Sequence, residues 1–251
     1  MILTGDDFST IVRAVEMGRG LYDNLKKYIR FQMGCLTGFI VTFLGAGIFN
    51  VVGGVPFLPL QTLYVNFTTQ VAQAIGLGYG KPDEGLMERK PRPPDERILP
   101  RDLLTWLVIA GGIMGIGTLG LMWWADDAHG AGFARTMGLT TFAIANIFLS
   151  LTVKDERRSM FNLETFADRR LLMATGVSCV AIVLGTELRI FNRILGTVSL
   201  TGSEWVVCIV VGAAIVIVSE IWKFVLRHRT TDETIVAAQA SAPSAPAAST
   251  T

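Results

Sequence analysis

Six segments of the chain each approach 20 predominantly apolar residues, roughly the length that an α-helix needs to cross the hydrocarbon core of a bilayer. Hydrophobic residues make up 51% of the sequence and charged residues 17%, which is too apolar for a typical soluble domain of 251 residues. The sequence therefore predicts an all-α membrane protein with six transmembrane helices. The predicted spans are Arg30–Val52, Val55–Leu77, Leu103–Ala125, Thr136–Val153, Leu171–Glu187 and Trp205–Leu226.

The basic residues are distributed unevenly between the two sides of the predicted membrane domain. When the connecting segments are assigned alternately to the two sides, nineteen of the 22 Lys and Arg residues fall on one side. The other side keeps only Arg135, Arg189 and Arg193. Because cytoplasmic segments carry the excess of basic residues, both termini are predicted to be cytoplasmic. We expect an integral protein of the plasma membrane that contacts the lipid bilayer and no nucleic acid.

A helical segment precedes the first predicted span. Apolar residues recur at helical spacing between residues 5 and 30, and Asp6 or Asp7 could cap the start of the helix. This cytoplasmic juxtamembrane helix, assigned to residues 1–29, either transmits movement from a soluble domain or lies on anionic lipid through its basic residues. The six-helix domain is assigned to residues 30–228. The Ala-, Ser- and Pro-rich residues 229–251 are predicted to form a disordered cytoplasmic tail.

One polar stripe interrupts the second apolar segment. Its four uncharged polar residues lie at positions i, i+3, i+4 and i+7, and therefore share one helical face: Asn66, Thr69, Gln70 and Gln73. Amides and hydroxyls at membrane depth are costly unless they face a partner helix, a water-filled cavity or a ligand. The stripe is therefore either part of a cation pathway or a set of interhelical hydrogen bonds.

No other part of the sequence offers a catalytic or metal site. Cys35, Cys179 and Cys208 all lie within apolar segments, without CxxC spacing, and are interpreted as packing residues. His129 follows Asp126 and Asp127 in a polar segment that is more typical of a solvated turn than of a metal site. We expect no metal, no cofactor and no catalytic residue in this chain.

Two long stretches resemble P-type cation-transporting ATPases. DDFSTIVRAVEMGRGLYDNLKKYIRF, residues 6–31, resembles the junction where the phosphorylation domain ends and the fifth membrane helix begins. LPLQTLYVNFTTQVAQAIGLGYGKPDEGLMERKPRPP, residues 58–94, is similar to the sixth membrane helix and following loop of the calcium-pump and sodium-pump branch. SEIWKFVLR, residues 219–227, looks like the end of the tenth helix. The resemblance covers residues 3 to 228 and implies that the six spans are the last six of the family.

The resemblance implies the C-terminal transmembrane part of an ATP-driven cation pump. The Asp-Lys-Thr-Gly phosphorylation motif and the nucleotide-binding domain, which use ATP and Mg in the parent family, precede the matching region and do not occur in this sequence. We therefore expect a truncated or split chain, with the missing N-terminal ATPase portion or another ATPase as partner. One alternative is a non-catalytic membrane scaffold or partner subunit. A small secondary transporter is disfavoured, because the second half of the sequence does not repeat the first.

The resemblance also bears on the polar stripe. Asn66 and Thr69 match cation-coordinating positions of the family, whereas Gln70 replaces an Asp. Three other coordinating positions of the family, two in the fifth helix and one in the eighth, hold apolar residues here: Leu36, Phe39 and Ala143. Hard divalent cations prefer anionic oxygen ligands, so tight calcium binding is not expected. The candidate cation pathway consists of Asn66, Thr69, Gln70 and Gln73.

Overall fold

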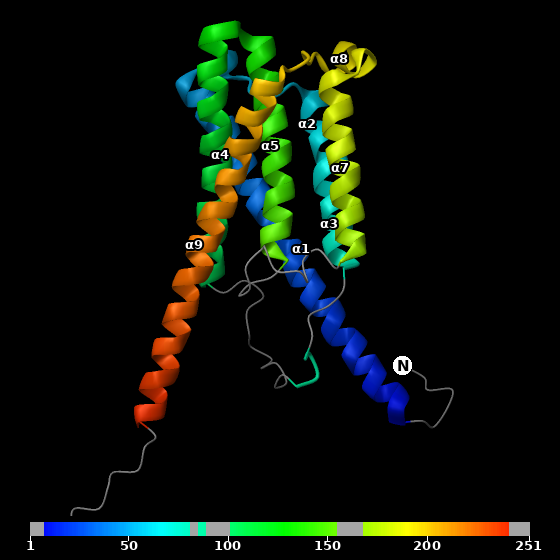
Figure 1. Cartoon of the computed structure of the whole chain (residues 1–251), viewed down its shortest axis with the longest axis vertical. Coiled ribbons are helices and arrows are strands. Elements are labelled where there is room, and N and C mark those ends of the chain that lie inside the picture. The colour runs from blue at the N-terminus through cyan, green and yellow to red at the C-terminus, as the bar shows by residue number, and fades with distance from the viewer. Residues whose placement is uncertain (1–7, 81–84, 89–100, 155–167, 241–251) are drawn as a thin grey trace, which may run out of the picture.

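All regular secondary structure in the described part of the chain is helical (Figure 1). The computed structural model describes residues 8–80, 85–88, 101–154 and 168–240. The expectations for residues 1–7 and 241–251 lie outside this part. The elements are α1 (Phe8–Phe49), η1 (Val51–Gly54), α2 (Pro59–Val65), η2 (Asn66–Val71), α3 (Ala72–Gly78), α4 (Arg101–His129), α5 (Ala131–Val153), α7 (Arg169–Glu187), α8 (Arg189–Leu195) and α9 (Gly202–Ala240).

Five of these helices are long and apolar enough to cross a membrane. They overlap five of the six predicted spans, with ends that differ by up to three residues where a predicted span is not wholly included: Phe8–Phe49, Leu104–His129, Ala131–Val153, Arg169–Glu187 and Gly202–Lys223. The remaining predicted span, Val55–Leu77, is divided into α2, η2 and α3, which have 7, 6 and 7 residues. The prediction of an all-α chain with several membrane helices is confirmed. This segment differs from the other five predicted spans because its helix changes its hydrogen-bonding pattern midway.

The predicted juxtamembrane helix and the first predicted span are one continuous helix. α1 has 42 residues and contains no proline, so nothing in its sequence forces a break. Its first turns project from the bundle (Figure 1), and most of their side chains are exposed, whereas burial begins at Gly20. At the other end of the chain, α9 runs to Ala240 and so enters the segment that was assigned to the tail.

α1 packs closely on α4 through two pairs of glycines. Gly34 and Gly38 are four residues apart on α1, as are Gly111 and Gly115 on α4, and this small-xxx-small spacing lets membrane helices approach. A Cβ atom added at Gly115 would lie 2.6 Å from the Cβ of Val41 and 2.9 Å from the carbonyl oxygen of Gly38. The two backbones are therefore too close for a side chain at this position.

α5 is the central helix of the bundle. Of its most apolar 18-residue window, 94% is buried, compared with 28% for α7 and α9. It packs against α4, α9, α7 and α1 (Figure 1). Polar residues on α5 therefore face other helices.

The turn between α1 and α2 is held by side chains from α4 and α5. Val52 adopts a left-handed conformation with φ of 53°, which is unusual for a β-branched residue. Its N–H donates to Oδ2 of Asp126 at 3.0 Å, and its carbonyl oxygen accepts from Nη2 of Arg135 at 3.3 Å. Arg135 also donates from Nε to the carbonyl oxygen of Val55 at 3.1 Å. The strained turn is thus stabilised by two charged residues that are distant in sequence.

Asp126→Ala is expected to lower the free energy of unfolding by about 1–3 kcal/mol, because the N–H of Val52 loses its acceptor. The neighbouring Asp127 is exposed, so Asp127→Ala is the matched control and is expected to change stability by less than about 0.5 kcal/mol. Thermal unfolding of both variants in the same lipid nanodisc measures the difference. Equal stability of the two variants would show that the Asp126 contact does not hold the turn.

Candidate functional site

The second predicted span contains a π-helical turn at the position of the polar stripe. η2 is a π-helix, and both of its ends continue in right-handed helical conformation into α2 and α3. Asn66, Thr69 and Gln70 lie on η2, and Gln73 lies on α3. π-turns are rare and occur frequently at functional sites. The structure thus places the stripe on the most irregular part of this span.

Thr69 takes part in hydrogen bonds that join three helices. Its Oγ1 accepts from Nδ2 of Asn146 on α5 at 3.2 Å and donates to the carbonyl oxygen of Val65 at 2.7 Å. Oδ1 of Asn146 in turn accepts from Sγ of Cys35 on α1 at 3.0 Å. Thr69, Asn146 and Cys35 are all buried. Thr69 is therefore satisfied by protein groups.

Gln73 is also satisfied, by residues of α5 and α7. Its Oε1 accepts from Oγ of Ser150 at 2.8 Å, and its Nε2 donates to Oγ of Ser178 at 3.2 Å. Ser178 also donates to the carbonyl oxygen of Thr68 at 3.1 Å. Interhelical hydrogen bonds of this kind contribute about 0.6 kcal/mol each. Thr69 and Gln73 thus fit the interpretation of the stripe as helix-to-helix hydrogen bonding.

Asn66 and Gln70 behave differently. Oδ1 of Asn66 and Nε2 of Gln70 are buried and have no hydrogen-bond partner in the structure. An unpaired buried amide group costs about 1–3 kcal/mol. The two residues are four positions apart, so their side chains lie on the same side of η2. The stripe therefore divides into two pairs. Thr69 and Gln73 form hydrogen bonds with neighbouring helices, whereas Asn66 and Gln70 each have one buried amide atom without a hydrogen-bond partner.

A small pocket adjoins η2 where it meets α5 and α7. Four threonines and Tyr64 are its only lining residues with polar side chains, and the other lining residues are apolar. The lining residues are Tyr64, Val65, Thr68, Thr69, Leu139, Thr140, Ala143, Ile182, Gly185 and Thr186. The Oγ1 atom of Thr140 is buried and has no hydrogen-bond partner. The pocket is therefore largely apolar, and neither Asn66 nor Gln70 is among its lining residues.

The surroundings of η2 contain no charge. No Asp, Glu, Lys or Arg occurs between Phe31 and Gly80, and α5 has none after Arg135. Phe39 packs in an aromatic cluster, with ring centroids 4.3 Å from Phe142 and 6.3 Å from Phe57. Among the described residues, no group of three or more His, Cys, Asp or Glu could hold a metal ion. A cation near η2 would meet neutral oxygens only.

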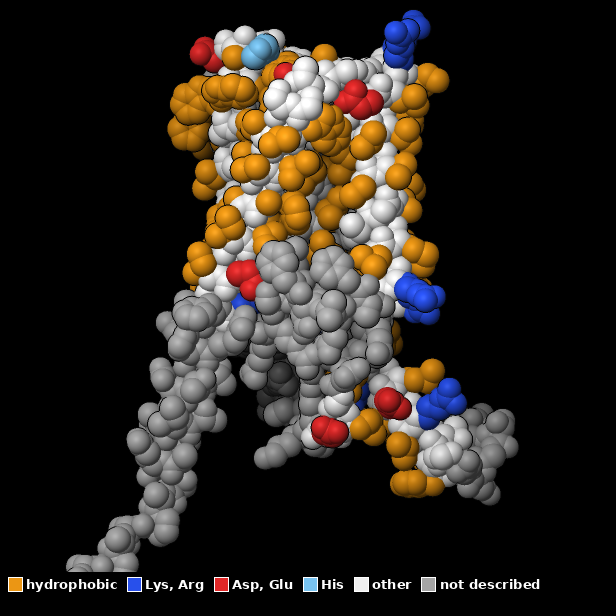
Figure 2. Space-filling view, viewed as in Figure 1, with side chains coloured by type: hydrophobic (Ala, Val, Ile, Leu, Met, Phe, Trp, Pro, Cys, Tyr) orange, Lys and Arg blue, Asp and Glu red, His pale blue; other side chains and the backbone are white. Residues whose placement is uncertain are grey.

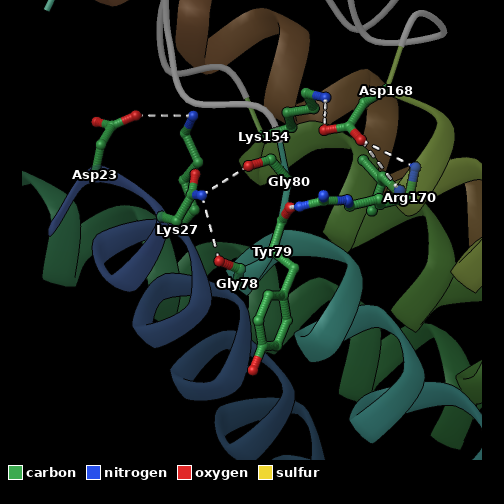
Figure 3. A network of polar contacts seen from close by, with 10 residues as sticks. Asp23, Lys27, Gly78, Tyr79, Gly80, Lys154, Asp168 and Arg170 are labelled. Carbon is green, nitrogen blue, oxygen red and sulfur yellow. Dashed lines mark hydrogen bonds and ion pairs between the residues drawn. The ribbon is translucent and has the colours of Figure 1, made fainter. Parts of the chain in front are cut away.

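The end of α3 is tied to two other helices (Figure 3). Nδ2 of Asn24 on α1 donates to the carbonyl oxygens of Gly78 at 3.3 Å and Gly80 at 2.8 Å. Nη1 of Arg170 on α7 donates to the carbonyl oxygen of Tyr79. Side chains thus satisfy carbonyl groups that the end of a helix leaves unpaired. Asn24 thus links α1 directly to the end of α3, the helix that follows η2.

Buried charges surround this junction. Asp168 forms an ion pair with Lys154 and caps α7 by accepting from the backbone N–H groups of Arg170 and Leu171. Lys27 forms an ion pair with Asp23 at 3.0 Å on α1. Figure 3 shows these two pairs on either side of the carbonyl groups of residues 78–80. The sequence analysis missed these residues, although an Asp directly before an apolar helix is a recognisable capping signal.

Comparisons with known proteins identify a family for this chain. The sequence model of the family described as "Cation transporting ATPase, C-terminus" matches residues 54–225. The chain belongs to this family. It is the C-terminal transmembrane region of a P-type cation-transporting ATPase, as the resemblance in the sequence indicated.

Curated relatives extend the match toward the N-terminus of the chain. The probable cation-transporting ATPase F of Mycobacterium tuberculosis is 32% identical over 223 residues, which are 87% of this chain and 24% of the relative. The calcium-transporting ATPase 1 of Lactococcus lactis is 31% identical over 225 residues, 89% of this chain and 25% of the relative. The calcium-transporting ATPase of Bacillus subtilis is 28% identical over 211 residues, which are 83% of this chain and 23% of the relative. The chain spans about a quarter of the length of these relatives.

Proposed function

We propose that this chain forms the cation-translocating part of a P-type ATPase and that Asn66 and Gln70 contact the cation. The supporting observation is the buried, unpaired Oδ1 of Asn66 on the π-turn. Gln70 would contribute its amide oxygen, because its unpaired Nε2 is a donor and cannot bind a cation. Thr69 and Gln73 line the same pathway and fix η2 against α5 and α7. ATP hydrolysis, with ATP and Mg, belongs in this proposal to an N-terminal ATPase portion that acts as the partner of this chain.

The neutral side chains bear on the choice of ion. Electrostatic attraction scales with the product of the charges, so the lack of a carboxylate weakens the binding of a divalent cation more than that of a monovalent one. Two of the relatives named above are called calcium-transporting. For this chain, the neutral Asn66 oxygen and the lack of charged residues between Phe31 and Gly80 support a monovalent cation as the transported ion.

We also propose that α2, η2 and α3 together form a sixth span. They run from Pro59 to Gly78, and 20 helical residues extend about 30 Å, which matches the hydrocarbon thickness of a bilayer. With six spans, both termini lie on the same side, and the excess of basic residues on that side supports a cytoplasmic location for both. The membrane in this proposal is the plasma membrane. The exposed start of α1 is then a cytoplasmic juxtamembrane helix.

This topology has a direct test by cysteine labelling. In a background with Cys179→Ser, Ala128→Cys in the last turn of α4 is expected to react with a membrane-impermeant maleimide added to intact cells. Ser9→Cys at the start of α1 is expected to react only after the membrane is permeabilised. The reverse pattern would contradict the proposed orientation. Labelling of both positions from outside would mean that an even number of spans separates them, which would contradict the three spans proposed between residues 9 and 128.

The pathway proposal is tested by Asn66→Ala in the pump assembled from this chain and its N-terminal portion. The variant is expected to raise the cation concentration for half-maximal ATP hydrolysis about fivefold, since one oxygen ligand worth about 1 kcal/mol is lost. Thr62→Ala, one turn earlier, is the matched control, because its hydroxyl donates to the carbonyl oxygen of Leu58, the residue just before α2. An unchanged cation dependence in folded Asn66→Ala would contradict the proposal and favour a scaffold role for this region.

A further inference from the structure

The short helix α8 carries exposed apolar and basic side chains together. Ile190 and Ile194 are four residues apart and are 67% and 57% exposed. Arg189 and Arg193 are also four residues apart and exposed. Residues four apart lie on the same side of a helix, so α8 presents an apolar side and a basic side.

α8 is held firmly on the bundle. Nε2 of the buried Gln61 on α2 donates to the carbonyl oxygen of Leu195 at 2.9 Å. In the segment that follows, Oγ1 of Thr197 donates to the carbonyl oxygen of Gly185 at 2.7 Å, and the N–H of Val198 donates to Oγ1 of Thr136 at 3.0 Å. The exposed side chains of α8 are therefore presented by a fixed element, not by a loose loop.

The position of α8 places it at a membrane boundary. It directly follows α7 and precedes α9, two helices long and apolar enough to span a membrane, and it lies at the same end of the bundle as η1 (Figure 1). On the face shown in Figure 2, hydrophobic side chains cover the shaft of the bundle, and basic side chains project from its edge over α8. The apolar side of α8 is thus adjacent to the surface that faces lipid.

We propose that α8 is an interfacial binding site for an anionic phospholipid. Ile190 and Ile194 pack among the acyl chains, and Arg189 and Arg193 bind the headgroup phosphate through charge-assisted hydrogen bonds. The charge of the site supports this occupant. Neither arginine has a partner in the described part of the chain, whereas Arg135, at the same end, donates to the carbonyl oxygens of Val52 and Val55. Arginine is suited to phosphate because its planar guanidinium can donate two parallel hydrogen bonds.

The binding test uses the purified chain in mixed micelles titrated with phosphatidylglycerol. The melting temperature is expected to rise with this lipid, and the double variant Arg189→Gln/Arg193→Gln is expected to need at least about tenfold more lipid for the same rise. Arg13→Gln/Arg169→Gln removes two exposed charges elsewhere and is the matched control. Soluble glycerol phosphate is expected to cause no rise. An equal response of the two double variants, or an equal effect of glycerol phosphate, would overturn the proposal.

The insertion of the apolar side has its own measurement. A nitroxide label at Ile190→Cys, in a Cys179→Ser background in nanodiscs, is expected to be relaxed more by oxygen than by a water-soluble nickel complex. A label at Asp127→Cys, exposed at the same end, is expected to show the opposite order. Stronger relaxation of the position-190 label by nickel would place α8 in water and overturn the proposal. Neither measurement depends on cation transport, so the result is independent of the proposed pathway.

Discussion

Gly115→Val is expected to remove most of the folded protein and to lower the free energy of unfolding by more than about 3 kcal/mol. A Cβ atom at this position would lie 2.6 Å from the Cβ of Val41 and 2.9 Å from the carbonyl oxygen of Gly38. The second of these contacts is with backbone, which cannot turn away as a flexible side chain can. Relief of the clash requires α1 and α4 to separate. Size-exclusion chromatography of the detergent-solubilised variant and its thermal unfolding measure this effect.

Gly112→Val provides the matched control for this prediction. It is the same substitution on the same helix, but a Cβ atom at Gly112 meets nothing within 4 Å. Any general effect of valine on the helix is therefore shared by both variants. We expect Gly112→Val to remain within about 1 kcal/mol of the parent chain. Comparable losses in the two variants would show that the glycine contact between α1 and α4 is not what limits stability.

Gln70→Asp is expected to increase the calcium affinity of the assembled pump at least about tenfold, which corresponds to about 1.4 kcal/mol. The substitution adds a carboxylate in surroundings that contain no other charge, so its attraction for a divalent cation is weakly screened. The response to a monovalent cation is expected to increase less, since its charge is half as large. Calcium-dependent ATP hydrolysis and transport in proteoliposomes measure both responses.

Gln70→Asn separates the effect of charge from that of side-chain length. It shortens the side chain as Asp does but remains neutral, and it is expected to leave the calcium response low. If Gln70→Asp only destabilises the protein and leaves the ion response unchanged, the stripe is better explained as helix packing. The pathway hypothesis would then lose the residue that most directly supports it.

The sequence predicted the location of the five long apolar helices because a membrane helix is defined by a local property, a long apolar run. It also placed Asn66, Thr69, Gln70 and Gln73 on one face. It could not divide them into two pairs, because their hydrogen-bond partners lie on helices that are distant in sequence. The π-turn was missed for a related reason, since an ideal helical period was assumed throughout.

Other features depended on which residues the fold brings together. Phe39 was recognised as an apolar residue at a family coordination position, but its packing on Phe142 and Phe57 required the structure. The contact of Asn24 with the end of α3 joins residues more than 50 positions apart. The capping role of Asp168, in contrast, is a local signal that the sequence does contain.

Because α1 is one continuous helix, it can move as a single rigid rod. A helix of 42 residues is about 63 Å long, and α1 has no proline at which it would bend. Asn24 is tied to the end of α3 and would be the pivot of a rigid swing of α1. The arm from Phe8 to Asn24 is about 24 Å and the arm from Asn24 to Cys35 is about 17 Å. If α1 moved as a rigid rod about this point, a sideways swing of about 3 Å at the exposed end would carry Cys35 about 2 Å in the opposite direction, and the hydrogen bonds that join Cys35 to Asn146 and Asn146 to Thr69 would have to lengthen or their helices follow.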